Sequence, residues 1–266
     1  MGGRPRGGRR GRPSGRLCLS FHRVETILTI MAAALWGGGT GVLIPRPAYR
    51  FSVPLEEPWR SACPDGHPLT GTGGGWLGRA RCAAGDTYGP STLSATAATA
   101  IVCTLLAAVI GLRPELVVWL LLAPTAVLLA TVDFAAHRLP DVLTLPLAAA
   151  LLFLLAVAAV LPGSGGSWTW ALLGSGIFGA CFLILFLLSK GIGFGDVKLA
   201  LVLGAVLGWY GWATVLVGTF AGYLFAALYG IGLMLAGRAD RTSRIPFGPF
   251  LLAGTLAGVL LGSQPF

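Results

Sequence analysis

The chain has 266 residues, of which 55% are hydrophobic and only 11% are charged. This balance excludes an ordinary soluble domain and predicts an all-α, polytopic protein whose surroundings are a lipid bilayer. The formal net charge is +9. Because the basic residues fall in an N-terminal tail and in loops, where membrane topology explains them, we expect no nucleic-acid partner.

Apolar runs of membrane-spanning length predict about eight transmembrane helices. They lie near residues 24–44, 91–112, 116–132, 143–161, 168–189, 197–209, 211–236 and 247–262. The chain then divides into an Arg- and Gly-rich disordered tail at 1–23, a first transmembrane helix at 24–45, a cytoplasmic loop at 46–90 and a transmembrane core at 91–266. Small residues four apart, such as Gly204 and Gly208, predict close packing between helices.

Basic residues gather in alternate loops, which predicts that these loops face the cytoplasm from a cell membrane. The opposite loops hold Arg113 as their only basic residue. The tail at 1–23 breaks this pattern, since it carries seven Arg and yet would lie outside. We expect that the biological start lies downstream, near Met31. N-terminal sequencing that found a mature chain beginning at Met1 or Gly2 would refute this expectation.

Two aspartates at this predicted cytoplasmic boundary are the candidate catalytic pair. Asp133 lies where an apolar run ends in a short polar turn, and Asp196 lies in a glycine-rich turn that opens another apolar run. An acid in or beside a bilayer is energetically costly, so it indicates a function. Two neighbouring carboxyl groups share one proton, so one activates a water while the other protonates an amide nitrogen, without a metal or covalent intermediate.

Five neighbouring residues are candidates for substrate binding or for support of the pair. They are Gly193, Gly195, Lys198, Pro140 and Asp141. The two glycines would let an extended substrate backbone approach the acid and let the turn adopt positive φ. Pro140 would fix the start of the next helix. Three acidic or basic residues here also have a structural interpretation: Asp141 as a helix cap or a partner of the helix dipole, Asp196 as a helix cap, and Lys198 as a side chain that reaches the lipid headgroups. In the functional interpretation, Lys198 meets an acidic group on a substrate.

Three strings resemble motifs that occur in this order in the type IV prepilin peptidases. They are Asp133-Phe-Ala-Ala-His-Arg-Leu-Pro-Asp-Val-Leu-Thr-Leu-Pro146, Gly193-Phe-Gly-Asp-Val-Lys-Leu199 and Ile245-Pro-Phe-Gly-Pro-Phe250. The resemblance is close from about residue 93 to the C-terminus and looser before it. It implies an eight-span aspartic endopeptidase of the G-x-G-D kind, with Asp133 and Asp196 as catalytic acids. Its substrates would be prepilin or pseudopilin precursors, cut at the cytoplasmic face after a Gly that ends a short basic leader.

The first loop departs from the family pattern. Longer family members carry two C-x-x-C pairs there, which look like a zinc site and accompany N-methylation of the product by S-adenosylmethionine. Here Gly66 and Gly85 replace the second Cys of each pair, leaving Cys63 and Cys82. Two thiolates fall short of the four ligands of structural zinc. Asp65 and His67 would complete such a set, but their spacing fits no common zinc pattern.

We therefore expect no metal and no cofactor, neither zinc nor S-adenosylmethionine, and regard methyltransferase activity as doubtful. Two other classes of function stay open: a transporter whose acids relay protons, and a catalytically inactive scaffold for assembly of an envelope apparatus. Presenilin-like proteases share G-x-G-D, but their first acid usually follows Tyr. Here Val132 precedes Asp133.

Overall fold

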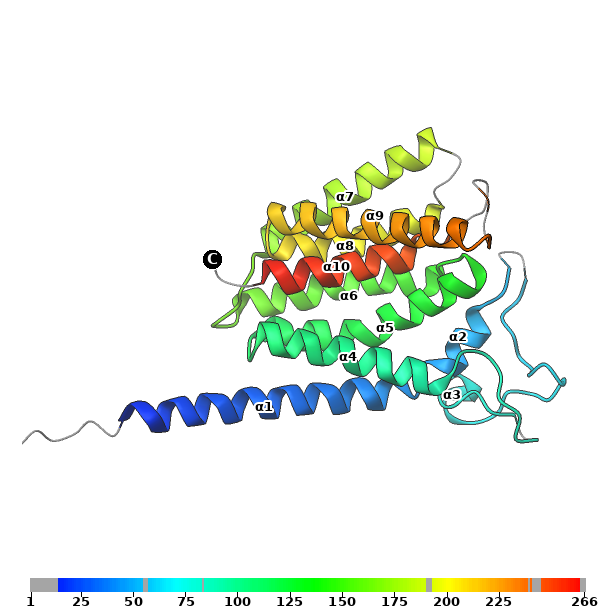
Figure 1. Ribbon diagram of the computed structural model, residues 1–266, viewed down its shortest axis with the longest axis horizontal. Helices are drawn as coiled ribbons and strands as arrows, with labels where there is room; N and C mark the ends of the chain where they lie inside the picture. Colours follow the sequence, from blue (N-terminus) through cyan, green and yellow to red (C-terminus); the bar gives the residue numbers. More distant parts are fainter. Residues whose placement is uncertain are drawn as a thin grey trace, which may run out of the picture.

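The computed structural model describes residues 14–54, 57–82, 84–189, 193–238, 240 and 245–263, with side chains from residue 23 onward. Within these residues the fold is all-helical, with isolated β-bridges only in the first loop. The helices are α1 (Ser14–Gly41), α2 (Pro45–Phe51), α3 (Thr72–Gly75), α4 (Thr92–Ile110), α5 (Pro114–Ala136), α6 (Asp141–Val160), α7 (Trp168–Leu188), α8 (Phe194–Trp209), α9 (Trp212–Leu235) and α10 (Gly248–Gly262). The long helices lie side by side and alternate in direction (Figure 1).

Each of the eight predicted apolar segments contains a helix. Five helices, α4, α5, α6, α7 and α9, are long and apolar enough to cross a membrane. Helices α1 and α2 give a sixth candidate span if they are counted together, with a bend of 45° between them. Helices α8 and α10 are shorter, with 16 and 15 residues. The fold is therefore that of a multi-pass membrane protein with five or six candidate spans among the described residues.

Three predicted boundaries were wrong. Helix α1 begins at Ser14, inside the predicted disordered tail, because residues 17–23 contain no Gly or Pro that would end a helix. Residues 1–13 of that tail lie outside the described residues. The loop predicted from residue 46 begins with α2, which a proline at its first position favours. Helix α8 begins at Phe194 rather than at residue 197, so Asp196 lies within its first turn.

Small residues bring α7 against α8 and α9 against α10. A Cβ atom on Gly204 would lie 2.4 Å from the carbonyl oxygen of Gly174, and one on Gly254 would lie 2.3 Å from the backbone nitrogen of Gly222. These distances leave no room for a side chain, which confirms the packing predicted from the glycine spacing. Helix α8 is buried from Val197 onward, along most of its length, whereas its first residue, Phe194, is exposed.

One end of the bundle gathers the connections that matter for function. The described parts of the α5–α6, α7–α8 and α9–α10 connections, the helix ends beside them, and α2 and α3 all lie at that end, on the right in Figure 1. The three motifs singled out in the sequence belong to these three connections and the helix ends beside them. The alternation of helix direction is thus what brings distant motifs to one place.

Candidate active site

Asp133 and Asp196 line one cavity of about 430 Å³. The cavity lies where α5 ends and α8 begins. Four of the five predicted supporting residues also line it: Gly193, Gly195, Asp141 and Lys198. Pro140 is not among the residues that line it. The fold therefore brings together six of the seven residues that were selected from the sequence.

Asp133 is held by the start of α10. Its side chain is 5% exposed, and its Oδ2 accepts a hydrogen bond of 3.0 Å from the backbone N–H of Gly248. A Cβ atom on Gly248 would lie 2.6 Å from that same oxygen, so only glycine allows this approach. Sequence reasoning missed Gly248 as a site residue, although it lies within the third motif, at residues 245–250. That motif was noted only for its resemblance to the family, and it did not predict a contact between Gly248 and Asp133.

Asp196 is the third residue of α8, and its Oδ2 accepts a hydrogen bond of 3.1 Å from the N–H of Gly193. The carboxylate thus satisfies a backbone donor at the helix start. Gly193 has φ −80° and ψ 151°, so the prediction of positive φ was wrong. Extended backbone is what a residue adopts immediately before a helix.

Gly195 serves close packing in the first turn of α8. A Cβ atom there would lie 3.1 Å from Cβ of Leu139, in the α5–α6 connection. The prediction that this glycine adopts positive φ was also wrong, since it has a helical place in α8. The absence of a side chain at residue 195 thus lets the segment that follows Asp133 contact the turn that carries Asp196.

Lys198 and Asp141 form an ion pair across the cavity wall. Lys198 Nζ lies 2.6 Å from Asp141 Oδ1, and the two side chains are 12% and 65% exposed. Nζ also lies 4.6 Å from the ring centroid of Phe194. Lys198 is therefore mostly buried and paired with Asp141, and its contact with lipid headgroups stays a prediction. Asp141 is the first residue of α6 and makes no capping hydrogen bond, but as an acid in the first turn it has the place of a helix-dipole partner, the other half of its structural interpretation.

The connection between α5 and α6 is fixed from both sides. Pro140 precedes α6 with φ −65°, and its carbonyl oxygen accepts hydrogen bonds from the N–H groups of Leu143 and Thr144. It opens α6 as predicted. Arg138 Nη1 donates a hydrogen bond of 2.9 Å to the carbonyl oxygen of Pro54, beyond α2. The connection that follows Asp133 is thereby tied to the first loop.

This arrangement suits acid–base chemistry. Among the described residues that line the cavity there is no Ser, Thr or Cys that would act as a nucleophile. Two carboxyl groups in one partly apolar cavity supply a base and an acid when they share a proton. Each carboxylate is oriented by a backbone N–H, which holds it without adding another titratable group.

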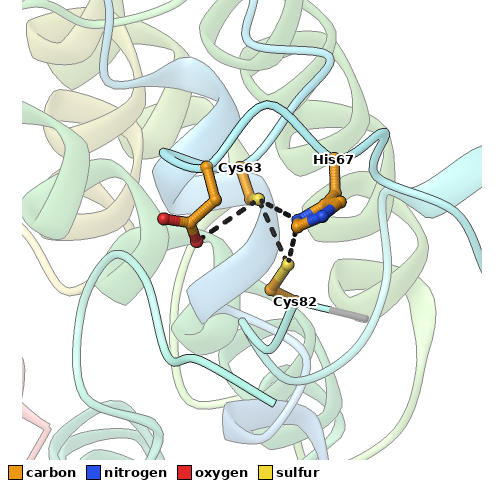
Figure 2. A group of neighbouring side chains, drawn as sticks. Cys63, His67 and Cys82 are labelled. Carbon is orange, nitrogen blue, oxygen red and sulfur yellow. Dashed lines mark hydrogen bonds between the residues drawn. The ribbon is translucent and has the colours of Figure 1, made fainter. Parts of the chain in front are cut away.

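A second group of polar side chains lies in the first loop. Ligand atoms of Cys63, Asp65, His67 and Cys82 all lie within 4.8 Å of one another, and Figure 2 shows the thiols and the imidazole pointing toward a common centre. The spacing argument that set these residues aside did not anticipate this grouping. The expectation of no metal and no S-adenosylmethionine stays a prediction.

Comparison with known proteins places the chain among leader peptidases. The model of the type IV leader peptidase family matches residues 120–231. A protein named prepilin leader peptidase/N-methyltransferase from Aeromonas hydrophila is 33% identical over 241 residues, which cover 80% of this chain and 74% of that protein. No solved structure gave a significant match.

Proteins of the same name from other bacteria match shorter parts of this chain. One from Aeromonas salmonicida (strain A449) is 36% identical over 151 residues, covering 52% of this chain and 47% of that protein. One from Pseudomonas aeruginosa is 32% identical over 160 residues, covering 56% of this chain and 49% of that protein. Together with the long match to the Aeromonas hydrophila protein, these relatives show that the chain belongs to the type IV leader peptidase family.

Proposed function

We propose that this protein is a membrane-embedded aspartic endopeptidase that removes the short basic leader from type IV prepilins or related pseudopilins. The observation that carries the proposal is the shared cavity of Asp133 and Asp196, in a chain that belongs to a leader peptidase family. In this proposal the two aspartates are the catalytic residues. Gly193, Gly195, Lys198, Pro140 and Asp141 support them, and Gly248 joins that set through its hydrogen bond to Asp133.

The reaction needs one ionised and one protonated carboxyl group. The ionised carboxylate takes a proton from a water, whose oxygen attacks the carbonyl carbon of the peptide bond after the leader's Gly. The protonated carboxyl donates its proton to the carbonyl oxygen, which gives a tetrahedral diol. The other aspartate then passes the proton that it took from water to the amide nitrogen, the C–N bond breaks, and a hydroxyl of the diol returns its proton to the first carboxylate as the pilin amine leaves. The Gly248 and Gly193 N–H groups keep the two carboxylates in place while their protons move.

The proposed topology has eight spans, with α8 and α10 as short membrane helices, and a cytoplasmic active site in the cell membrane. The positive-inside rule supports this orientation, because Arg138 and Lys198 belong to the same end of the bundle as the two aspartates. A prepilin would place its basic leader at this end and its apolar helix in the bilayer.

The position of the acids argues against a proton-relaying transporter, because both lie at one end of the bundle and not midway along it (Figure 1). The relatives' printed names include N-methyltransferase. For this chain that second activity stays doubtful, since Gly66 and Gly85 stand where the family pattern has Cys.

The test is cleavage of a precursor from the same genome that carries a basic leader, a Gly and an apolar helix. Membranes that contain the chain are expected to shorten this precursor at the bond after the Gly, as read by the intact mass of the product. A precursor with the Gly replaced by Leu is the matched control and should stay intact. If the precursor is uncut, or cut elsewhere, the chain is not its leader peptidase and the scaffold alternative gains. The same mass shows whether a methyl group has been added.

A further inference from the structure

The first loop contains a compact group of metal-ligand side chains that lies apart from the catalytic cavity. Sγ of Cys63 lies 3.2 Å from Sγ of Cys82 and 3.6 Å from Nδ1 of His67, and that nitrogen lies 3.1 Å from Sγ of Cys82. Oδ2 of Asp65 lies 3.9 Å from Sγ of Cys63. None of these residues lines the cavity of Asp133.

The separations are close to the edges of one coordination tetrahedron, and all four ligand atoms lie within 4.8 Å of one another. Zinc bonds of about 2.3 Å to sulfur and about 2.0 Å to nitrogen or oxygen give ligand–ligand edges of roughly 3.5 to 3.8 Å. The four measured separations, from 3.1 to 3.9 Å, bracket that range. The sulfur–sulfur separation of 3.2 Å also exceeds the bond of about 2.05 Å in a disulfide, and both thiols are free.

Two turns of the same form carry the two cysteines. In the first, the N–H of Cys63 donates to the carbonyl oxygen of His67, and the N–H of Gly66 donates back to Cys63. In the second, the N–H of Cys82 donates to Asp86, and that of Gly85 donates back to Cys82. Both glycines have positive φ, 82° and 96°, which a second Cys at these places would strain. Both turns thus keep a cysteine at the first position and a glycine at the fourth.

The replacement ligands come from the first turn alone. His67 closes that turn and Asp65 lies inside it, whereas Asp86, at the equivalent place in the second turn, is not part of the group of four. One turn therefore supplies thiolate, carboxylate and imidazole, and the other supplies a single thiolate. This unequal split explains why the C-x-x-C spacing did not predict the group.

The two turns lie over a small apolar core. This core has four buried members, Cys63, Leu69, Ala80 and Tyr88, with Tyr49 and Cys82 packed against them. A unit this small rarely folds on apolar burial alone and usually relies on a metal or a disulfide.

We propose that Cys63, His67 and Cys82, with Asp65 as fourth ligand, bind one tetrahedral divalent transition-metal ion, zinc by preference, which holds the two turns together. Two thiolates, an imidazole and a carboxylate favour zinc over magnesium or calcium, which prefer oxygen ligands. Four protein ligands leave no open position for water or substrate, so the ion is structural. The site is distinct from a four-thiolate site because half of its ligands are not sulfur.

The test measures metal content in the full-length chain, purified in detergent from a medium that contains all common trace metals. Wild type is expected to retain about one zinc per chain, and the double variant Cys63→Ser/Cys82→Ser to retain none, as measured by inductively coupled plasma mass spectrometry. Asp86→Asn and Cys181→Ser are the matched controls and should keep the metal. Wild type without metal, or a double variant that keeps it, overturns the proposal. So does an intact mass two hydrogens lighter, which would mean a disulfide.

A second set of measurements begins with the wild-type protein, so that it does not rest on variants alone. Wild type stripped with a chelator and reloaded with Co²⁺ should show the visible absorption of tetrahedral, thiolate-bound cobalt, and His67→Ala should change that spectrum. Trypsin should cut at the exposed Arg79 and Arg81 faster in the stripped protein, and added Zn²⁺ but not Mg²⁺ should reverse this. An octahedral cobalt spectrum, or equal cleavage with and without Zn²⁺, contradicts the site.

Discussion

The catalytic cavity and the first loop lie at the same end of the bundle, yet they are built in opposite ways. The cavity takes its acids from the ends of long, buried helices, α5 and α8. The loop takes its four ligand residues from two short turns over a small core. The G-x-G-D motif of the cavity is present in the sequence. The first loop lacks the second cysteine of each C-x-x-C pair and still brings four possible ligand side chains together. In this chain, the two aspartates at the helix ends were therefore easier to find from the sequence than the four ligand residues on the turns.

The largest effect that distinguishes the two regions is expected from Gly248→Ala. The added Cβ would lie 2.6 Å from Asp133 Oδ2, so the carboxylate must move away from its N–H partner. A misplacement of about 1 Å in a catalytic group costs on the order of 100-fold in rate. The measurement is the initial rate of prepilin cleavage. Gly232→Ala, where nothing lies within 4 Å of the new atom, should leave the rate unchanged. An active Gly248→Ala would remove the assigned role of this contact.

A smaller loss is expected from Asp141→Asn. The change leaves the ammonium of Lys198 without its partner, although that side chain is only 12% exposed. Because Asp141 itself is largely exposed, we expect the pair to contribute about 1 kcal/mol, or roughly a fivefold loss of cleavage rate. Comparison with Lys198→Met sharpens the test, because that change removes the buried charge together with its desolvation cost. A larger loss on Asp141→Ala than on Asp141→Asn would point to packing instead of charge.

The link between the two regions is tested by Arg138→Gln. Its guanidinium bonds the carbonyl oxygen of Pro54 from the connection that follows Asp133. Loss of one exposed hydrogen bond of this kind costs about 0.5 to 1 kcal/mol, so cleavage should fall roughly two- to fivefold. Arg79→Gln, an exposed change in the same loop, is the control. Equal rates for both variants would mean that the loop does not position the catalytic connection.

The smallest effect on cleavage is expected from removal of the metal. If the loop only packs beside the cavity, chelation should lower the rate by less than about twofold while it exposes Arg79 and Arg81 to trypsin, because local opening need not spread to a buried helix end. Cleavage rate and trypsin cutting are measured on the same sample. Complete loss of cleavage on chelation, restored by Zn²⁺, would instead make the loop part of the catalytic unit.

The helices and the two aspartates could be predicted from the sequence alone. Apolar runs located all eight long helical segments, because helices in lipid must satisfy their own backbone and so follow hydrophobic length. Asp133 and Asp196 stood out because acids are rare in such runs. Gly248 did not, since its role is a backbone N–H, which every residue except proline offers. The partners of Lys198 and Asp141 depend on how α6 and α8 pack.

In the proposed function, two aspartates perform the cleavage. The most direct test compares the wild type with Asp133→Asn and Asp196→Asn in membranes that contain equal amounts of each protein. Asn keeps the size and the bond to the backbone N–H but cannot exchange a proton, so each variant should lose at least about 100-fold in rate. Asp86→Asn, an acid in the first loop, should cleave at the wild-type rate. If either Asp133→Asn or Asp196→Asn cleaves as fast as the wild type, that residue is not catalytic and the paired-acid mechanism is wrong.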